Sequence, residues 1–513
     1  MNPVHTSLRL PSEALAALHA LRDGAGPRQT LGLSDARVLA CADRHPALRE
    51  AVAAAVDAAV ALDREYPGLR QRDEQALIAD VQEGFVHFYP AEAVNPYVPL
   101  AARGPWVVTS HGAVLHDSGG YGMLGLGHTP ASVLAVLGQP QVQANIMTPS
   151  FSHKRFIERM RREVGHTRGG SPFSHFLCLN SGSESMSIAS RICDIHAHTL
   201  TRPGARFAGR PSKSVAVRGA FHGRTDRPAR ISDSSRSKYQ AHLKSFQGLD
   251  NLYTVPSNDV DALHAVFAQA EADGVFIEAV YMEPVMGEGN PGVGITRAFY
   301  DAARALTLQH DAMLIIDSIQ AGLRAHGVLS VVDYPGFADA LAPDMESWSK
   351  AINGGQYPLS VLGLTSRAAH TYVRGLYGNT MTTNPRALEV AVTVLDLFTD
   401  ALRANIVRQG QRFVAALRDL QREFPHIITG VSGTGLLFAC DLDEARFPVM
   451  GTDGGVELLC RQRGLGVIHG GKNALRFTPH FEITDDEVDL VIEELRAVFA
   501  SLPVEGGFSH PAR

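Results

Sequence analysis

The sequence predicts an α/β fold whose large domain contains a mostly parallel sheet, joined by a smaller α+β domain and a helical N-terminal extension. Between about residues 170 and 365, short apolar runs alternate with helical stretches. The runs are Phe176–Leu179, Ser214–Val217, Ala279–Met282, Met313–Ile316 and Ser360–Leu364. Such alternation is typical of a parallel sheet covered by helices on both faces. At 513 residues the chain exceeds the size of a single core, so at least two domains are expected.

The N-terminal 90 residues are predicted to be helical. Apolar residues recur at intervals of three and four in the segments Ser12–Leu21, Ala47–Asp63 and Asp73–Phe88. From about Tyr97 the pattern changes to short β-like runs separated by Gly-rich turns. We therefore predict an extension over residues 1–90, followed by a segment over residues 91–140 that contributes to the smaller domain and to the active site.

The C-terminal part is predicted to form most of the smaller domain. Residues 386–424 are helical in pattern, and the sequence then returns to alternating strands and helices. The elements are the strands Gly435–Cys440 and Leu475–Thr478 and a helix from Asp485 to Leu502. The predicted boundaries are accordingly residues 141–385 for the large domain and 386–513 for the C-terminal small domain.

The charge balance argues against nucleic acid and membrane partners. The 47 basic and 53 acidic residues are spread along the chain and give a formal net charge of −6, without a basic block that would attract phosphates or anionic lipids. The richest apolar segment, Ala51–Leu62, is alanine-heavy and is broken by Asp57. Neither a signal peptide nor a membrane span is expected.

The cysteines and histidines give no sign of a disulfide framework or a metal site. Five cysteines are scattered along the chain and include no CxxC pair. His196 and His198 are two positions apart, which would place them on different faces of a helix, so ordinary histidines are favoured over metal ligands. A reducing, cytoplasmic setting is expected.

Polar residues follow four of the predicted strands near their carboxyl ends, where active sites of open α/β sheets form. Glu283 follows the strand Ala279–Met282, and Asp317 follows Met313–Ile316. After the first strand, Gly182 and Ser183 appear at the start of a helix whose N–H groups can bind a phosphate, although an ordinary N-cap is the favoured interpretation of these residues taken alone. After the second strand, Phe221 offers an aromatic face and Arg224 a bidentate partner for a carboxylate. Taken singly, a core phenylalanine and a surface arginine are the competing interpretations.

Asp317 and Lys350 indicate the cofactor. Asp317 directly follows the apolar run Met313–Ile316, and Lys350 comes 33 positions later in a Gly-rich turn. A buried carboxylate is costly unless paired. A protonated pyridine nitrogen would pair with it through a charge-assisted hydrogen bond of about 1.5–3 kcal/mol. A lysine amine can bind an aldehyde. Pyridoxal phosphate (PLP) has both a pyridine nitrogen and an aldehyde.

In these motifs the chain resembles the class III aminotransferases of the ornithine and ω-amino acid type, which are PLP-dependent enzymes of fold type I. The resemblance extends from about Tyr97 to the C-terminus, and the motifs occur in the family's order. They are Asn180–Glu184, Phe221–Arg224, Asp317–Gln320, Ser349–Gly355, Gly378–Pro385 and Leu475–Pro479. The resemblance implies a large domain with a seven-stranded, mostly parallel sheet and a homodimer with the active site at the subunit interface.

The resemblance also implies a role toward PLP for several residues. Lys350 would form the Schiff base, and Asp317 would bind the ring nitrogen. Gln320 would bind the ring hydroxyl, while Phe221 and Ile319 would clamp opposite faces of the ring. Three further residues would bind the phosphate, and these are Gly182, Ser183 and, from the neighbouring subunit, Thr380.

The residues implied to bind substrates are Tyr97, Tyr121, Arg224, Glu288 and Arg476. Glu288 would neutralise Arg476 while a donor without a carboxylate at that point is bound. When glutamate or 2-oxoglutarate binds, the pair would open and Arg476 would take the α-carboxylate. The expected activity is thus a ping-pong transfer of an amino group between an amine or amino acid donor and a keto acid.

Two departures from the family place the substrate in question. Ser318 stands where the family has a glutamate, and the family's Thr-Gly-Phe-Gly-Arg run is replaced by Ala321–Ala325, which includes Arg324. A racemase, an aminomutase or a decarboxylase on the same fold is the alternative. Gly120–Gly125 satisfies the GxGxxG pattern of NAD-dependent oxidoreductases, but neither a helix start nor an acidic residue about 20 positions on follows it.

Overall fold

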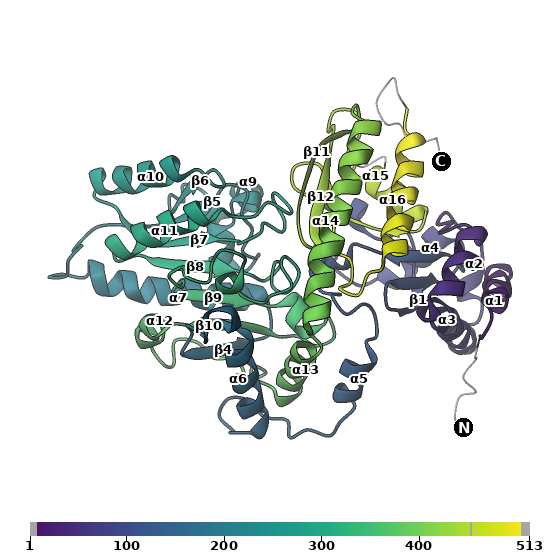
Figure 1. Ribbon diagram of the computed structural model, residues 1–513, viewed down its shortest axis with the longest axis horizontal. Helices are drawn as coiled ribbons and strands as arrows, with labels where there is room; N and C mark the ends of the chain where they lie inside the picture. Colours follow the sequence, from purple (N-terminus) through teal and green to yellow (C-terminus); the bar gives the residue numbers. More distant parts are fainter. Residues whose placement is uncertain (1–7, 452–453, 504–513) are drawn as a thin grey trace. The chain divides into compact units, whose positions relative to one another are not determined.

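The computed structural model describes residues 8–451 and 454–503. The chain forms two compact units (Figure 1). The first unit comprises the described parts of residues 1–131, 409–432 and 438–513, and the second comprises residues 132–408 and 433–437. The boundaries predicted at residues 90, 140 and 385 separate segments by their expected function and not by compactness, and they stay predictions.

A seven-stranded sheet forms the centre of the second unit, in the order β4-β10-β9-β8-β7-β5-β6. Its strands are β4 His175–Leu179, β5 Ser212–Val217, β6 Leu252–Val255, β7 Phe276–Met282, β8 Met313–Asp317, β9 Met345–Trp348 and β10 Ser360–Leu364. β10 is antiparallel to both of its neighbours, and the other pairs are parallel. The predicted mostly parallel sheet is confirmed.

The sequence pattern missed two of these strands. Every residue of β9 is buried, yet the strand includes Glu346 and Ser347, so its polarity concealed it. β6 is short and mostly half-buried. By contrast, β8 is buried along its whole length and reads as an apolar run, as expected for a central strand of a parallel sheet.

Helices cover both faces of this sheet. Because crossovers between parallel strands are right-handed, the direction in which the chain crosses the sheet decides the face on which each helix lies. The chain crosses in one direction from β4 to β5 and then to β6, and the helices of these crossovers, α7 (Gly182–Thr201) and α8 (Asp226–Ile231), lie on one face. It returns through α10 (Val260–Ala272) and α11 (Arg297–Gln309), which lie on the other face. The remaining helices of this unit are α5 Ala131–Leu137, α6 Phe151–Glu163, α9 Arg236–His242, α12 Ser366–Thr371 and α13 Pro385–Asp396.

The first unit contains a four-stranded sheet and most of a second one. One sheet has the order β1-β2-β3-β13, and the other β11-β12-β15-β14. Their bounds are β1 Pro99–Arg103, β2 Trp106–Thr109, β3 Val114–Asp117, β11 Ile428–Thr434, β12 Leu437–Leu442, β13 Leu465–Gly466, β14 Ile468–Gly470 and β15 Ala474–Phe477. With α15 (Val456–Gln462) and α16 (Asp485–Ala500), this is the α+β architecture expected of the smaller domain. α14 (Asp400–Glu423) begins in the second unit and ends in the first.

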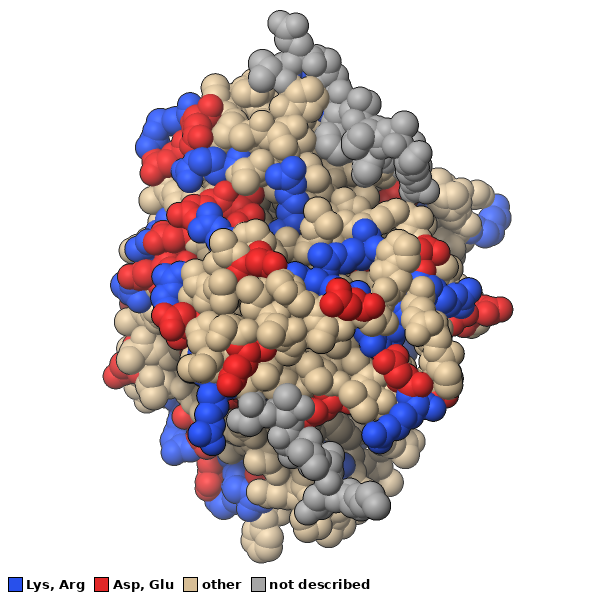
Figure 2. Space-filling model, turned by 90° about the vertical axis from the view of Figure 1, so that its right-hand side faces the viewer, with Lys and Arg blue, Asp and Glu red and all other residues tan. Residues whose placement is uncertain are grey.

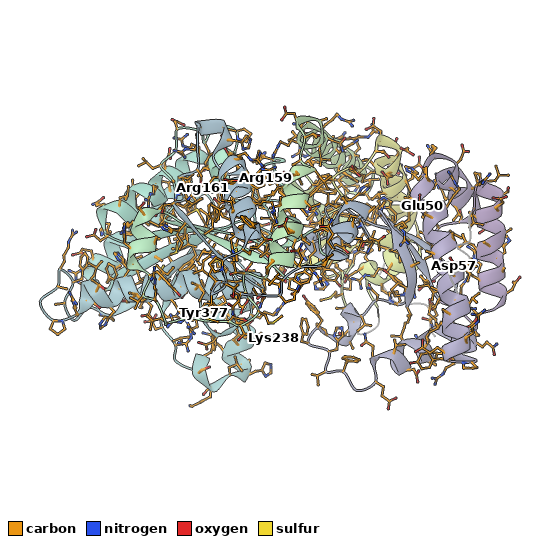
Figure 3. All side chains as sticks on the ribbon, turned by 90° about the horizontal axis from the view of Figure 1, so that it is seen from below. Glu50, Asp57, Arg159, Arg161, Lys238 and Tyr377 are labelled. Carbon is orange, nitrogen blue, oxygen red and sulfur yellow. The ribbon has the colours of Figure 1, made fainter. Side chains whose placement is uncertain are left out.

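The N-terminal extension consists of α1 Pro11–Asp23, α2 Asp35–Arg44, α3 Pro46–Glu65 and α4 Glu74–Gln82. Small side chains on one face of α3, including Ala51 and Ala55, share a core with Trp106 and Val108 of β2. Figure 3 labels Glu50 and Asp57 on the same helix. The extension is therefore part of the hydrophobic core of the first unit.

The prediction of a helix reaching Phe88 is wrong. The helix ends at Gln82, and Gly84 adopts a left-handed conformation with φ of 84°. The apolar side chains that prolonged the pattern are exposed, with Phe85 at 80%, Val86 at 96% and Phe88 at 77% of their full area. Apolar spacing alone therefore did not locate the end of this helix.

One face of the molecule carries charged side chains of both signs (Figure 2). Figure 2 shows basic and acidic side chains interspersed on the face that it displays. Among the described helices, none combines the length and the apolar character needed to cross a membrane.

Candidate active site

The predicted cofactor residues of the second unit, apart from Thr380, follow strands that point the same way. β4, β5, β7, β8 and β9 are mutually parallel, so their carboxyl ends meet at one edge of the sheet. Ligands of open α/β sheets bind at this edge. The segments that follow these strands supply the site.

Lys350 lies two residues beyond the end of β9, in a short 3-10 turn over Lys350–Asn353. Its φ is 48°, a left-handed conformation that costs a non-glycine residue about 1–3 kcal/mol. Its Nζ donates a hydrogen bond to Oε1 of Gln320. Two of the residues predicted to act on the same cofactor are thus in direct contact.

Asp317 is buried and is held by two hydrogen bonds. Its Oδ2 lies 2.8 Å from Nδ1 of His222, and because a carboxylate only accepts, Nδ1 donates. Its Oδ1 accepts from the backbone N–H of Ile319 at 3.1 Å. The main-chain N–H of His222 donates in turn to Ser232 at 2.9 Å. The carboxylate is therefore fixed in orientation by two neighbouring loops.

Glu283, which directly follows β7, is a second buried carboxyl group near Asp317. It accepts from the backbone N–H of Phe221 at 3.0 Å and from that of Gly287 at 2.8 Å. Burial raises the pKa of this carboxyl to about 7, although the nearby His222 and both N–H donors oppose the shift. Glu283 ties together the loops that present Phe221 and Gly287.

The start of α7 fits the predicted phosphate site. Ser181 caps the helix, accepting from the N–H of Glu184, so Gly182 and Ser183 fall in the first turn, where N–H groups have no partner within the helix. A Cβ at Gly182 would lie 2.7 Å from Cδ1 of Ile319. A larger residue at position 182 would therefore displace the side chain of Ile319.

The segment before Thr380 is anchored on the same helix. Oε1 of Glu184 accepts from the hydroxyl of Tyr377 at 2.9 Å and from Nδ2 of Asn379 at 2.7 Å, and Tyr377 is labelled in Figure 3. Thr380 itself is exposed, and its carbonyl accepts from Asn145 at 3.3 Å. Its side chain is thus accessible to a second molecule.

Arg224 and Glu288 form an ion pair within the second unit. Nη2 of Arg224 lies 3.7 Å from Oε1 of Glu288, and both side chains are partly exposed. The guanidinium also lies 5.2 Å from the centre of the Phe221 ring. Three residues predicted to act on cofactor or substrate therefore form one cluster.

The other predicted substrate residues, Tyr97, Tyr121 and Arg476, belong to the first unit. Asp117 holds the turn that bears Tyr121, because its Oδ1 accepts from Gly119 and Gly120 at 3.0 Å. Burial raises the pKa of both tyrosines. Arg476 is buried on β15. The pairing of Glu288 with Arg476 stays a prediction.

Three potential metal ligands of the first unit already interact with one another. Oε1 of Glu487 lies 3.2 Å from Nε2 of His480 and 3.5 Å from Nε2 of His116. Burial opposes ionisation, but the two imidazoles hold the pKa of Glu487 well below its usual range. These contacts account for the cluster without a metal, and the expectation that no metal is bound stays a prediction.

Comparison with known proteins identifies the family. The sequence profile of the family "Aminotransferase class-III" matches residues 88–499. The chain is 30% identical to acetylornithine aminotransferase of Xanthomonas axonopodis pv. citri (strain 306), over 82% of this chain and 98% of that protein.

This chain belongs to the class III aminotransferases.

Two further similarities agree with this assignment. Ornithine aminotransferase 2 of Staphylococcus aureus (strain Mu50 / ATCC 700699) is 28% identical over 79% of this chain and 94% of its own length. A structure of ornithine aminotransferase from Toxoplasma gondii, reported with partial occupancy of PLP at its active site, superposes with a TM-score of 0.71. The superposition covers 86% of this chain and 98% of that one at 22% identity, and it shows the fold type I architecture.

Class III aminotransferases are PLP-dependent enzymes, and this member has residues that fit the cofactor. Gln320 is the clearest test, because Lys350 occupies its Oε1 while its buried Nε2 has no hydrogen-bond partner in the described part of the chain. A buried donor of this kind needs an acceptor, and the hydroxyl oxygen of PLP is one. The Lys350 amine, the buried Asp317 carboxylate and the glycine-containing start of α7 match its other functional groups.

Two contributors to this aminotransferase site were not assigned from the sequence, namely His222 and Glu283. His222 belongs to the Phe221–Arg224 motif, and Glu283 directly follows the predicted strand Ala279–Met282. The available signal was the cost of burying a second acid beside Asp317. The sequence did not show which residues pair, because His222 and Asp317, like Glu283 and Phe221, follow different strands.

Proposed function

We propose that this aminotransferase moves an amino group from an amine or amino acid donor of the ornithine type to a keto acid, with 2-oxoglutarate as acceptor. The observation that supports this proposal most directly is the convergence of Lys350, Gln320 and Asp317 at one sheet edge, with Lys350 in contact with Gln320 and Asp317 bonded to His222. The names of the relatives suggest the donor class.

Each residue at this edge would have a separate task toward PLP, which when bound supplies an electron sink for charge that develops on the substrate carbon. Lys350 would bind the aldehyde, and Asp317, held by His222, would bind the ring nitrogen. Gln320 would donate from Nε2 to the ring hydroxyl. The residues proposed to fix the ring faces and the phosphate are Phe221, Ile319, Gly182, Ser183 and the partner subunit's Thr380.

The Lys350 amine would also move the proton. Once an incoming donor has displaced it, the amine is free to act as a base on the substrate carbon. Its contact with Gln320 would keep Nζ beside the residue proposed to bind the ring hydroxyl. The buried carboxylate of Asp317 would stabilise positive charge at the ring nitrogen through a charge-assisted hydrogen bond.

A panel of donor amines tests the proposal. The visible absorbance of the bound cofactor should fall when an accepted amine is added, and 2-oxoglutarate should restore it. If pyruvate restores this absorbance and 2-oxoglutarate does not, the acceptor is pyruvate. Exchange of the α-proton without consumption of a keto acid would establish a racemase instead.

Glu288 is proposed to alternate between two arginines. It lies 3.7 Å from Arg224, and Arg476 is the predicted second partner. A Glu288→Ala substitution is expected to raise the KM for the donor about tenfold or more, because an unneutralised arginine costs the donor complex about 1.4 kcal/mol or more. The 2-oxoglutarate half-reaction should change by less than about threefold.

Single-turnover measurements of the two half-reactions would check this prediction. Asp226→Ala is a suitable control, since this nearby acidic side chain is exposed and its ion pair is with Arg230. Equal effects of Glu288→Ala on both half-reactions would contradict a gating role.

We further propose a homodimer whose active sites are shared between subunits. Large apolar side chains of the second unit are exposed, including Ile146, Met147, Phe151 and Met381. Ile146 and Met147 line a groove together with Tyr377 and Thr380. Exposed apolar patches commonly mark protein interfaces, and a second copy that covers this one would bring the partner's Thr380 to the phosphate site.

Mixing two inactive variants tests the shared site. In a heterodimer of Lys350→Ala and Thr380→Ala chains, one site has both residues intact, so random mixing should restore about a quarter of the wild-type activity. Each variant alone should be far less active, most clearly at low PLP concentration. Activity no greater than the sum of the separate variants would place Thr380 in its own subunit's site or outside it.

The setting is proposed to be cytoplasmic. The five cysteines are all buried as free thiols, which is consistent with a reducing compartment.

A further inference from the structure

Glu346 is a buried carboxyl group directly behind the Asp317 segment. It lies on β9, is fully buried, and accepts three hydrogen bonds from neutral donors. Oε1 accepts from the hydroxyl of Ser318 at 2.6 Å and from the N–H of Val331 at 2.9 Å, and Oε2 accepts from the hydroxyl of Ser330. A buried acid is costly, so its retention in a central strand needs an explanation.

Ser318 contacts β9 through its main chain as well as through its hydroxyl group. In the β8–β9 register, Ile316 is opposite Glu346 and Asp317 is opposite Ser347. The N–H of Ser318 donates to the carbonyl of Ser347 at 2.9 Å. Ser318 is therefore fixed to β9 by both its backbone and its side chain.

The turn that Ser318 belongs to contains three residues proposed to contact PLP. Asp317, Ile319 and Gln320 are its immediate neighbours, so a shift of Ser318 would move all of them. The carboxyl group that accepts from Ser318 comes from the adjacent strand, β9.

We propose that Glu346 is a positioning residue for cofactor binding, acting through Ser318 to hold the turn from Asp317 to Gln320. This inference rests on the proposed roles of those residues toward PLP. Glu346 itself touches neither cofactor nor substrate.

The environment of Glu346 suits a structural anchor. Burial raises its pKa to about 7, and Asp333 adds to the shift, while the donors Ser318, Ser330 and Val331 oppose it. The other titratable groups that sense it are Tyr300 and Tyr334, whose pKa values burial and its charge raise. Whether it is protonated or ionised, one oxygen remains able to accept from Ser318.

Two matched serine variants separate positioning from general stability. Both serines donate to Glu346, but only Ser318 adjoins Asp317. Ser318→Ala is expected to raise the Kd for PLP, measured by titration of the apoenzyme, about tenfold. Ser330→Ala should lower the melting temperature of the apoenzyme by a similar amount to Ser318→Ala, yet change the Kd less than about twofold. Equal changes of Kd in both variants would overturn the proposal.

Two further variants show whether the effect passes through Glu346. Ser318→Thr keeps the donor and should retain a near wild-type Kd. In a Glu346→Leu background, Ser318→Ala should add little further loss, because the interaction is already absent. Fully additive losses would contradict a path through Glu346. If the wild-type chain does not bind PLP, the proposed function fails and this inference fails with it, whereas equal changes of Kd in the two serine variants overturn the inference alone.

Discussion

Replacing Lys350 with alanine is expected to abolish transamination, lowering kcat by at least about 10⁴-fold, because one side chain is proposed to serve both as the covalent anchor and as the base. The variant should also lack the visible absorbance of covalently bound cofactor. The cost to folding should be small, because Lys350 lies outside β9 in a strained left-handed conformation.

Lys350→Arg is the matched control. It keeps the positive charge and a donor for Gln320, but a guanidinium is not deprotonated at neutral pH and does not attack an aldehyde. Both variants should therefore be inactive, with melting temperatures of their apoenzymes close to the wild type. Measurable turnover in the arginine variant would show that the covalent link is dispensable, and a visible band in the alanine variant would place the anchor at another lysine.

Most of the large sheet could be predicted from the sequence, because an apolar strand is a local pattern. An apolar run that ends in an acid, as Met313–Asp317 does, specifies a buried strand and a polar residue at its end. The carboxyl ends of parallel strands lie together, so the residues that follow recognised strands, such as Gly182, Phe221 and Asp317, could be placed at one edge without coordinates.

Contacts between distant segments could not be predicted in the same way. His222 reaches Asp317 across 95 positions, and Glu346 reaches Ser318 across 28. Nothing local in either segment specifies its partner. Glu346 also made β9 hard to recognise, because a buried acid does not fit the apolar pattern of a central strand. The donors that make its burial possible come from other segments.

The second large effect is expected at Asp317. An Asp317→Asn substitution keeps the shape of the side chain but removes its charge, and kcat should fall by about 10²–10³-fold, as when other preorganised electrostatic groups are lost. Lys350 remains, so the visible band of the bound cofactor should persist. Loss of kcat with retention of the band distinguishes an electrostatic role from one in cofactor capture.

His222 provides the comparison that assigns this effect to the carboxylate and its orientation. His222→Ala removes the donor at 2.8 Å from Asp317 but leaves the charge, so its loss of kcat should be smaller, about tenfold. If Asp317 acts through its charge, Asp317→Asn should remain far more damaging in the His222→Ala background as well. A double variant no worse than His222→Ala alone would mean that Asp317 serves mainly to hold His222, and the ring nitrogen would then need another partner.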